Sequence, residues 1–277
     1  MDLPLAIVRE AVTRALAEDF GVLGDLTSAL VPDVRASGQI RSRAVGVLAG
    51  SACASEVFAQ VDHGIEVAWT VTEGGHLVAG TVAATVSGPL RSILSAERTA
   101  LNFLCHLSGV ATATRRFVDA VATVNNRTQV WDTRKTLPGL RALEKAAVRA
   151  GGGVNHRGSL SDFVLVKDNH LAGLPIAEAV HRARTRWPAR AVEVECERIE
   201  QVRDAVAAGA SLVMCDNMTP AQVAEVVAFV AGRALVEVSG GITLDNVAAY
   251  AATGVDLVST SAITQSAPAL DLGLDLT

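Results

Sequence analysis

Aromatic residues and lysines are scarce in this chain, and long apolar runs are missing. Aromatic side chains make up 4% of the residues, whereas hydrophobic residues make up 50% and charged residues 19%. This composition is typical of an Ala/Val-rich globular enzyme and excludes a disordered or fibrous chain. No run of about 18 consecutive apolar residues occurs, so the sequence predicts no transmembrane helix.

An excess of positive charge is also missing, since the formal net charge is −5. We therefore expect neither a nucleic-acid partner nor a membrane partner. The N-terminus lacks a basic segment followed by an apolar core, which makes the cytoplasm the expected location. No CxxC pair and no zinc-ligand spacing with histidine is present, which predicts reduced thiols at all four cysteines: Cys53, Cys105, Cys196 and Cys215.

The C-terminal half repeats one pattern, in which a short β-branched run is followed by polar residues and then by a stretch with helical periodicity. Gly209, Gly232 and Gly254 occupy positions typical of helix C-caps, and Thr219 and Thr243 occupy positions typical of N-caps. Strands that alternate with helices predict a parallel sheet. The expected strands are 130–131, 163–166, 191–194, 211–214, 235–238 and 255–258.

The placement of polar residues favours one of two parallel architectures. A doubly wound sheet gathers its catalytic residues at one switch point, whereas a barrel takes them from the C-terminal ends of many strands. Six repeats and polar residues after nearly every strand predict an α/β barrel with fewer than eight strands, although propensity alone leaves a doubly wound sheet open. The strand-end residues are Arg134, Lys135, Lys167–Asn169, Glu195, Asp216, Asn217 and Ser239–Gly241.

The first hundred residues follow a different pattern and predict a separate α+β domain. We expect a helix near 4–19 and strands near 39–48, 65–71 and 81–87, with glycine-rich turns between them. A lipoyl-type hairpin is excluded in this part of the chain. Such a hairpin needs a lysine to carry the lipoyl group, and no lysine precedes Lys135. A helix from 94 to about 124 would bridge the two parts.

Lysine is rare here, and its placement is informative. Only three lysines occur, and Lys135 and Lys167 stand just after or at the end of predicted strands. Burying a lysine at a strand end is unfavourable unless an anion pairs with it, so function explains Lys167 better than solubility does. Further positive charge comes from Arg98, Arg134 and Arg157, beside His156, and such groups bind carboxylates and phosphates.

Glu195 and Asp216 follow neighbouring strands and would face the same end of the barrel. Two carboxylates there suit ribose hydroxyls or a magnesium ion bound through water. The alternative is a structural ion network in which the two acids pair with Lys135 and Lys167.

Ser239-Gly240-Gly241 follows the next strand. We expect it to open a helix, so that exposed backbone N–H groups and the helix N-terminus cradle a phosphate.

Taken in order, these motifs resemble the quinolinate phosphoribosyltransferase family of type II phosphoribosyltransferases, nearly from end to end. The matching segments are Glu18–Asp19, Gly24–Ser28, Glu97–Asn102, Leu107–Gly109, Trp131–Thr136, Asn155–Arg157, Lys167–His170, Val192–Glu195, Asp216–Met218 and Ser239–Gly241.

The resemblance implies an N-terminal open-faced α/β sandwich followed by an incomplete α/β barrel with six or seven strands. The sandwich would span 1–108 and be joined by the tail 267–277, and the barrel would span 109–266. It also implies at least a homodimer. The implied reaction transfers the phosphoribosyl group of phosphoribosyl pyrophosphate to quinolinate with decarboxylation, giving nicotinate mononucleotide, pyrophosphate and CO2.

The resemblance further implies how the site is divided. Quinolinate would be bound by Arg134, His156, Arg157 and Lys167, with Arg98 reaching in from the partner subunit. Phosphoribosyl pyrophosphate would be bound by Lys135, Glu195, Asp216, Ser239, Gly240, Gly241 and Ser261. Magnesium would sit at Glu195 and Asp216 through water, and the catalytic group would comprise Lys135, Lys167, Glu195 and Asp216.

Four residues depart from the family pattern. Ser261 and Gln265 stand where glycine and histidine are usual, near the expected phosphate end, and Gly158-Ser159 replaces a bulky residue followed by glycine. A paralogue acting on another aromatic carboxylate is therefore an alternative. Two further alternatives are a Schiff-base aldolase using Lys167 and a phosphate-sensing regulator without turnover.

Overall fold

The computed structural model describes residues 3–277, which form two compact units. The first comprises the chain up to Arg115 together with Thr136–Gly152 and Ile263–Thr277, and the second comprises Arg116–Lys135 and Gly153–Ala262. The domain boundary expected after residue 108 stays a prediction. Within the described chain, no helix combines the length and apolarity needed to cross a membrane.

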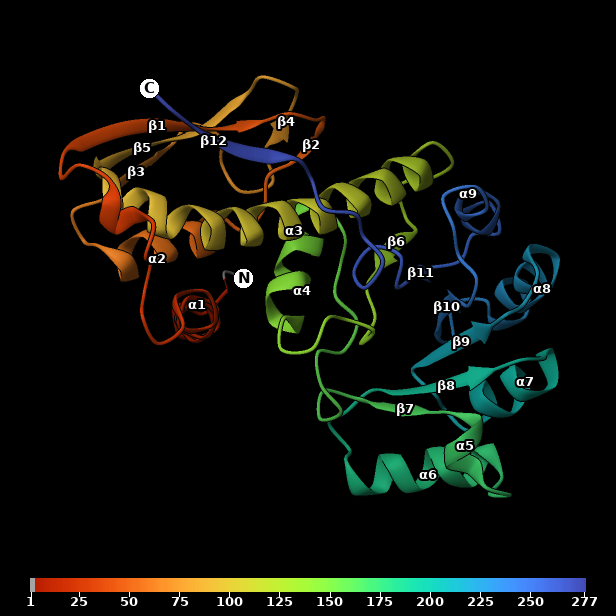
Figure 1. Cartoon of the computed structure of the whole chain (residues 1–277). Coiled ribbons are helices and arrows are strands. Elements are labelled where there is room, and N and C mark those ends of the chain that lie inside the picture. Colours follow the sequence, from red (N-terminus) through yellow and green to blue (C-terminus); the bar gives the residue numbers. More distant parts are fainter. Residues whose placement is uncertain (1–2) are drawn as a thin grey trace. The chain divides into compact units, whose positions relative to one another are not determined.

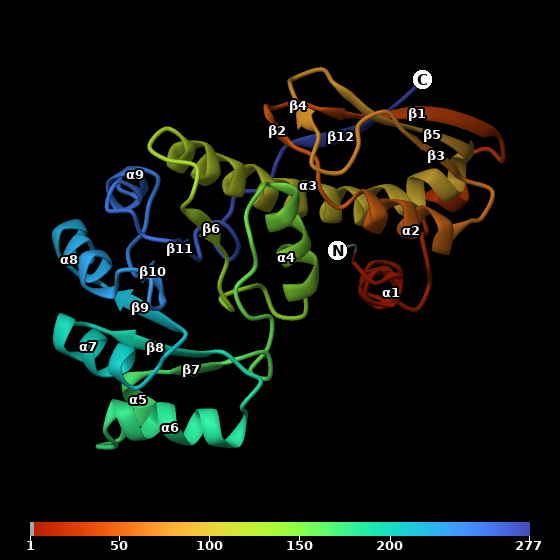
Figure 2. The same ribbon diagram turned by 180° about the vertical axis from the view of Figure 1, so that it is seen from behind.

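The first unit is built on an antiparallel sheet with the strand order β12-β1-β5-β3. Helix α2 (Ser51–Val61) and the long helix α3 (Leu90–Ala122) run along one face of this sheet (Figures 1 and 2). These layers are those of an open-faced α/β sandwich and confirm the expected architecture. The strands of the sheet are β1 (Arg35–Ser42), β3 (Glu66–Trp69), β5 (Val82–Pro89) and β12 (Leu272–Leu276).

Shorter elements complete the first unit. Helix α1 (Leu5–Phe20) confirms the helix expected near 4–19, and α3 confirms the expected bridging helix. The remaining elements are the 3-10 turn η1 (Ser28–Leu30), the small antiparallel pair β2 (Gly46–Val47) and β4 (His76–Leu77), and helix α4 (Arg141–Ala150).

The C-terminal tail belongs to the sheet of the first unit. β12 pairs antiparallel with β1 from Gly38↔Leu276 to Ser42↔Leu272. The tail approaches α3 so closely that a Cβ atom at Gly109 would lie 2.1 Å from the Pro268 carbonyl oxygen. Only glycine fits at this point of α3, which gives the Leu107–Gly109 motif a packing role.

The second unit is an open barrel of six parallel strands in the order β6-β11-β10-β9-β8-β7. β6 and β7 are its two edges, so the barrel is incomplete, as expected. All six predicted strands are confirmed within a few residues. They are β6 (Gln129–Trp131), β7 (Val164–Val166), β8 (Val192–Cys196), β9 (Leu212–Asp216), β10 (Leu235–Ser239) and β11 (Leu257–Ser259).

Helices follow the strands on the outside of this sheet (Figure 1). Thr219 and Gln222 form a capping box at the start of α8, which confirms the predicted N-cap. Gly209, Gly232 and Gly254 have positive φ just after three of the helices, which confirms the predicted C-caps. The helices are α5 (Asp168–Leu171), α6 (Ile176–Arg186), α7 (Ile199–Ala207), α8 (Pro220–Val230) and α9 (Val247–Ala251).

Three local predictions were wrong, and two of them concern the Gly240-Gly241 turn and the residues after it. Helix α9 begins only at Val247, because the backbone N–H of Thr243 donates to the Asn246 side chain in a turn that precedes the helix. Thr243 is therefore not an N-cap, and the Gly240-Gly241 turn does not open a helix. The strand expected over 39–48 ends at Ser42, whose hydroxyl donates to the Ala44 carbonyl in a turn.

Candidate active site

Chemistry-bearing side chains gather at the C-terminal end of the barrel strands, around a cavity of about 560 Å³. Every lining residue belongs to the second unit. The cavity brings together ten of the twelve predicted site residues: Arg134, Lys135, His156, Arg157, Lys167, Glu195, Asp216, Ser239, Gly240 and Gly241.

Cationic groups line one part of this cavity. Arg157 is 8% exposed, and its guanidinium donates to the Phe163 carbonyl and lies 5.9 Å from the centre of the Phe163 ring. Burial lowers the pKa of Arg157, and the positive charge of Arg134 lowers it further. Two guanidinium groups that repel each other in a part-buried wall are stabilised when an anion binds between them.

Asp132 fixes the turn that carries His156 and Arg157. Asp132 is fully buried at the end of β6, and its carboxylate accepts hydrogen bonds from Asn155 Nδ2 at 2.6 Å and from the His156 backbone N–H at 2.9 Å. The following Gly158 and Ser159 backbone N–H groups donate to the Asp162 carboxylate. The unusual Gly158-Ser159 pair is thus held in an outer turn, and neither residue lines the cavity.

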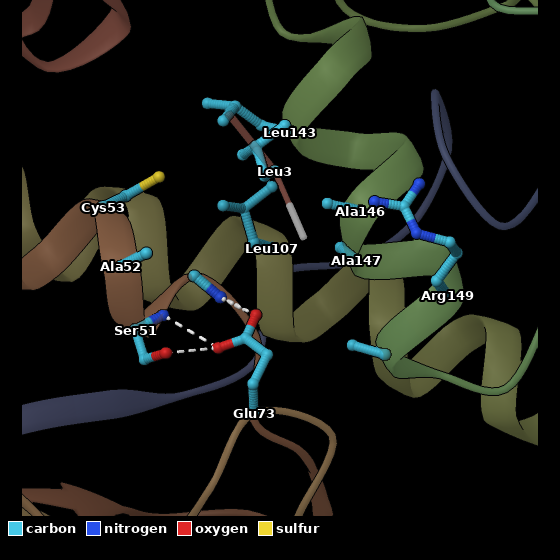
Figure 3. A pocket seen from close by; sticks show the side chains of 12 residues that line it. Leu3, Ser51, Ala52, Cys53, Glu73, Leu107, Leu143, Ala146, Ala147 and Arg149 are labelled. Carbon is cyan, nitrogen blue, oxygen red and sulfur yellow. Dashed lines mark hydrogen bonds between the residues drawn. The ribbon is translucent and has the colours of Figure 1, made fainter. Parts of the chain in front are cut away.

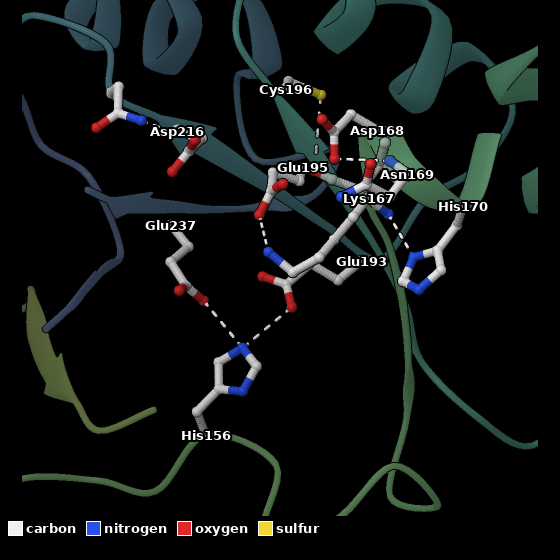
Figure 4. Close-up of polar contacts among 12 residues, drawn as sticks. His156, Lys167, Asp168, Asn169, His170, Glu193, Glu195, Cys196, Asp216 and Glu237 are labelled. Carbon is white, nitrogen blue, oxygen red and sulfur yellow. Dashed lines mark hydrogen bonds and ion pairs between the residues drawn. The ribbon is translucent and has the colours of Figure 1, made fainter. Parts of the chain in front are cut away.

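Lys167 forms an ion pair with Glu195 across the ends of β7 and β8 (Figure 4). The Lys167 side chain is 40% exposed and the Glu195 side chain 13%. Two residues that the sequence assigned to different substrates are therefore direct neighbours. The pair lies where the two halves of the expected site meet.

A turn rich in backbone N–H groups lies at another part of the cavity. Gly240 has φ +91°, and a Cβ atom there would lie 2.3 Å from Asn217 Oδ1, so the turn requires glycine. Asp216 ends β9 in this region and accepts a hydrogen bond from Asn217 Nδ2 at 2.9 Å. Backbone N–H groups in such a turn can bind phosphate without a helix N-terminus.

Glu195 and Asp216 stand at the ends of neighbouring strands in the same cavity. Magnesium prefers one or two carboxylates together with water and substrate phosphates. The residues present therefore fit such an ion, although Glu195 also engages Lys167.

Beneath these groups lie two glutamates that the sequence showed only as strand residues. Glu193 and Glu237 are 0% exposed, and both approach His156 Nε2, at 3.1 Å and 3.6 Å respectively (Figure 4). Ligand atoms of the three residues lie within 4.8 Å of one another, close enough to share a small cation. A charged residue inside an otherwise apolar parallel strand was the signal that could have revealed them.

Burial dominates the electrostatics of this glutamate pair. It raises the pKa of Glu193 to about 7, against the lowering effects of Glu237, Arg157 and Lys167. It also raises the pKa of Glu237 well above its usual range, and the neighbouring charge of Glu193 raises it further.

Two predicted residues do not line this cavity. Arg98 is an exposed residue of α3 and belongs to the first unit. Ser261 lies two residues beyond Ser259, which lines the cavity in its place. Gln265, one of the departures from the family pattern, is exposed and also belongs to the first unit.

A second cavity, of about 510 Å³, lies within the first unit (Figure 3). Its walls are mainly apolar, and its carboxylate, Glu73, accepts hydrogen bonds from the Gly50 and Ser51 backbone N–H groups at the start of α2. Glu73 therefore caps a helix. Because this cavity gathers no comparable set of charged side chains, the cavity at the barrel end is the candidate active site.

An open parallel barrel with cations, carboxylates and a glycine turn at its strand ends defines a barrel enzyme that acts on anionic substrates. Residues 25–108 match the family described as "Quinolinate phosphoribosyl transferase, N-terminal domain", and residues 110–275 match "Quinolinate phosphoribosyl transferase, C-terminal domain". The chain belongs to the quinolinate phosphoribosyltransferase family.

Individual relatives are similar over nearly their whole length. The chain is 42% identical over 285 residues to "Nicotinate-nucleotide pyrophosphorylase [carboxylating]" of Mycobacterium leprae, covering 99% of each chain. It is 39% identical to the "Probable nicotinate-nucleotide pyrophosphorylase [carboxylating]" of Bacillus subtilis, covering 98% of this chain and 93% of the relative. The solved nicotinate-nucleotide pyrophosphorylase of Francisella tularensis matches with a TM-score of 0.95 and 38% identity, covering 100% of this chain and 98% of that chain.

Proposed function

We propose that this chain transfers the phosphoribosyl group of phosphoribosyl pyrophosphate to quinolinate with decarboxylation, giving nicotinate mononucleotide, pyrophosphate and CO2. The observation that carries the proposal is the placement of Arg134 and the buried Arg157 with Lys167 in one cavity, beside carboxylates and the Gly240-Gly241 turn. A planar dicarboxylate matches the first group, and a phosphorylated sugar matches the second. The names of the full-length relatives describe the same reaction.

The arrangement supports a mechanism without a covalent intermediate. Departure of pyrophosphate leaves an oxocarbenium-like ribosyl carbon, which the pyridine nitrogen of quinolinate attacks. Arg134 and Arg157 orient the ring by its carboxylates, and Lys135 binds the phosphoribosyl substrate. Loss of the 2-carboxylate then leaves an electron pair beside a ring cation, and the lysine and arginine charges around the cavity stabilise it.

We also propose magnesium as the cofactor, held by Asp216 and Glu195 through water. When bound, it would neutralise negative charge on the leaving pyrophosphate. This assignment rests on two carboxylates at neighbouring strand ends, within the cavity that contains the glycine turn.

A homodimer in which Arg98 completes the partner's quinolinate site is the proposed assembly. Arg98 is exposed on α3, and therefore accessible to a second chain. We further propose a cytoplasmic location, because all four cysteines are free, as in reducing compartments.

The direct test is incubation with quinolinate, phosphoribosyl pyrophosphate and magnesium, followed by separate measurement of nucleotide, pyrophosphate and CO2. Equal amounts of the three products are expected. Nicotinate, which lacks the 2-carboxylate, is the matched control and should react far more slowly, because one carboxylate leaves part of the cationic wall unpaired. Absence of products from quinolinate, with product from another aromatic carboxylate, would establish the paralogue instead.

A further inference from the structure

Unassigned chemistry lies at the floor of the barrel cavity, beneath the groups that the proposed mechanism uses. Glu237 projects inward from β10 and contributes to the cavity wall, yet it is 0% exposed. Glu193 projects inward from β8 and is equally buried. Figure 4 shows both carboxyl groups directed at the His156 ring. Neither glutamate has a role in the mechanism described so far.

The charges around the two carboxyl groups are unequal. His156 Nε2 lies 3.1 Å from the Glu193 carboxyl group, and Arg157 and Lys167 also lie near Glu193. The basic group that approaches Glu237 is His156, at the longer distance of 3.6 Å. Two ionised carboxylates side by side in a fully buried site are strongly unfavourable, so one of them retains a proton. The surroundings favour Glu237 as the carboxyl group that retains the proton.

The other neighbours of Glu237 do not change this assignment. β9 presents the buried thiol of Cys215, whose pKa is raised to about 12 by burial first and by Glu237 second, so it stays neutral. β11 presents the hydroxyl of Ser259, which carries no charge. Neither Cys215 nor Ser259 therefore adds a charge beside Glu237 near neutral pH.

We propose that Glu237 is the general acid of the decarboxylation, resting as a neutral carboxylic acid and supplying the proton that replaces the lost carboxylate on the pyridine ring. This inference rests on the proposed function. In the step, the bond between ring carbon 2 and the carboxylate carbon breaks, CO2 leaves, and the electron pair remains on carbon 2. The Glu237 proton bonds to that pair, and Glu237 becomes a carboxylate beside His156. Water returns the proton once product has left.

Protonation also makes the decarboxylation irreversible. Without a proton donor, the carbanion at carbon 2 can recapture CO2 before it leaves the cavity. A carboxylic acid in the cavity wall traps the carbanion at once. Removing such a group typically lowers the rate by about 10²–10⁴-fold.

The test separates pyrophosphate release from CO2 release in single turnovers of the full-length protein, with quinolinate labelled in its 2-carboxylate. Glu237→Gln keeps the size and neutrality of the side chain but cannot transfer a proton. We expect pyrophosphate release to stay within about twofold of the wild-type rate, while CO2 release falls by about 10²-fold. The dicarboxylated nucleotide should accumulate.

Two further variants complete the design. Glu237→Asp keeps the acid and should restore part of the CO2 release. Cys215→Ala is the matched control, because Cys215 is buried on the neighbouring strand and does not line the cavity. It should release both products at wild-type rates.

Wild-type rates of both products from Glu237→Gln would overturn the proposal, and so would an equal fall in both. Failure of the proposed function has a different signature, because the wild-type protein would then release no pyrophosphate from these substrates. If a variant does not fold, a measurement on the wild-type protein still tests the proposal. Its infrared spectrum at pH 8 should show the carbonyl band of a buried protonated carboxyl group, and absence of that band overturns the proposal.

Discussion

At the residue scale, Arg157 combines two properties that seldom occur together. It is 8% exposed, and the burial and the neighbouring Arg134 both lower its pKa. A part-buried cation with a like-charged neighbour is held in an unfavourable environment until an anion arrives. Functional sites commonly store strain of this kind, because bound substrate then relieves it.

Replacing Arg157 with alanine should raise the KM for quinolinate about 10- to 100-fold, since charge-assisted hydrogen bonds contribute about 1.5–3 kcal/mol. The KM for phosphoribosyl pyrophosphate should change little. Arg190→Ala is the control, because exposed Arg190 donates to the Asp162 carbonyl near the same turn but does not line the cavity. Steady-state kinetics with each substrate varied in turn provides the measurement. Equal losses toward both substrates would contradict the division of the site.

Glu193 should make stability depend on pH. Its pKa is about 7 in the folded protein and 4.5 in the reference state. Because the folded-state pKa is raised, the stabilising contribution is complete below about pH 4.5 and is lost as pH rises through about 7. We expect the free energy of unfolding to fall over this window in the wild type and to fall less in Glu193→Gln. Urea unfolding at several pH values measures it, and parallel curves for the two proteins would refute the assignment.

At the scale of elements, the sequence predicted all six barrel strands, because most of them are β-branched runs that are largely buried on both faces. It missed α2, which has no local N-cap. Gly50 precedes α2 with φ +92°, and the capping carboxylate comes from Glu73, 23 residues further along the chain. Caps formed by distant residues leave no local signal.

The candidate site shows the same limit. Residues that follow strands could be found from the order of the chain, because parallel strands bring their C-terminal ends together. The pairing of Glu193 with Glu237 could not be found in this way, because β9 separates their strands. Their carboxyl groups meet only because both side chains point into the barrel from β8 and β10. The sequence also gave no sign that Asn217 packs against Gly240.

The turn at Gly240 offers a test with a built-in control. In Gly240→Ala, the new Cβ would lie 2.3 Å from Asn217 Oδ1, at a φ of +91° that side chains rarely adopt. In Gly241→Ala, φ is +62° and no atom lies within 4 Å. We expect Gly240→Ala to raise the KM for phosphoribosyl pyrophosphate much more than Gly241→Ala, with little change for quinolinate. Similar effects of the two variants would show that the turn does not bind phosphate by its shape.

At the scale of the whole molecule, the proposed dimer predicts complementation between inactive variants. Arg98→Ala should disable the quinolinate site of the partner chain, whereas Asp216→Ala should disable the site of its own chain. Mixing the two variants after reversible dissociation should restore activity to about one quarter of the sites. Random pairing makes about half of the dimers mixed, and each mixed dimer has one intact site out of two.

The control is a mixture of Arg134→Ala with Asp216→Ala. Both residues line the same cavity of one chain, so no mixed dimer would contain an intact site. Recovery in the first mixture and none in the second is the expected result. No recovery in either mixture would place the function of Arg98 within its own chain.

Pairing of β12 with β1 has a consequence for how the protein is made. β1 ends at Ser42, whereas its neighbour β12 begins at Leu272, so the sheet of the first unit lacks an edge strand until the whole barrel has been synthesised. A nascent chain therefore exposes the unpaired edge of β1 throughout translation of the barrel. Chains cut short before Leu272 keep that edge open, and open strand edges promote aggregation. The first unit can therefore complete its sheet only after the segment that follows the barrel has been made.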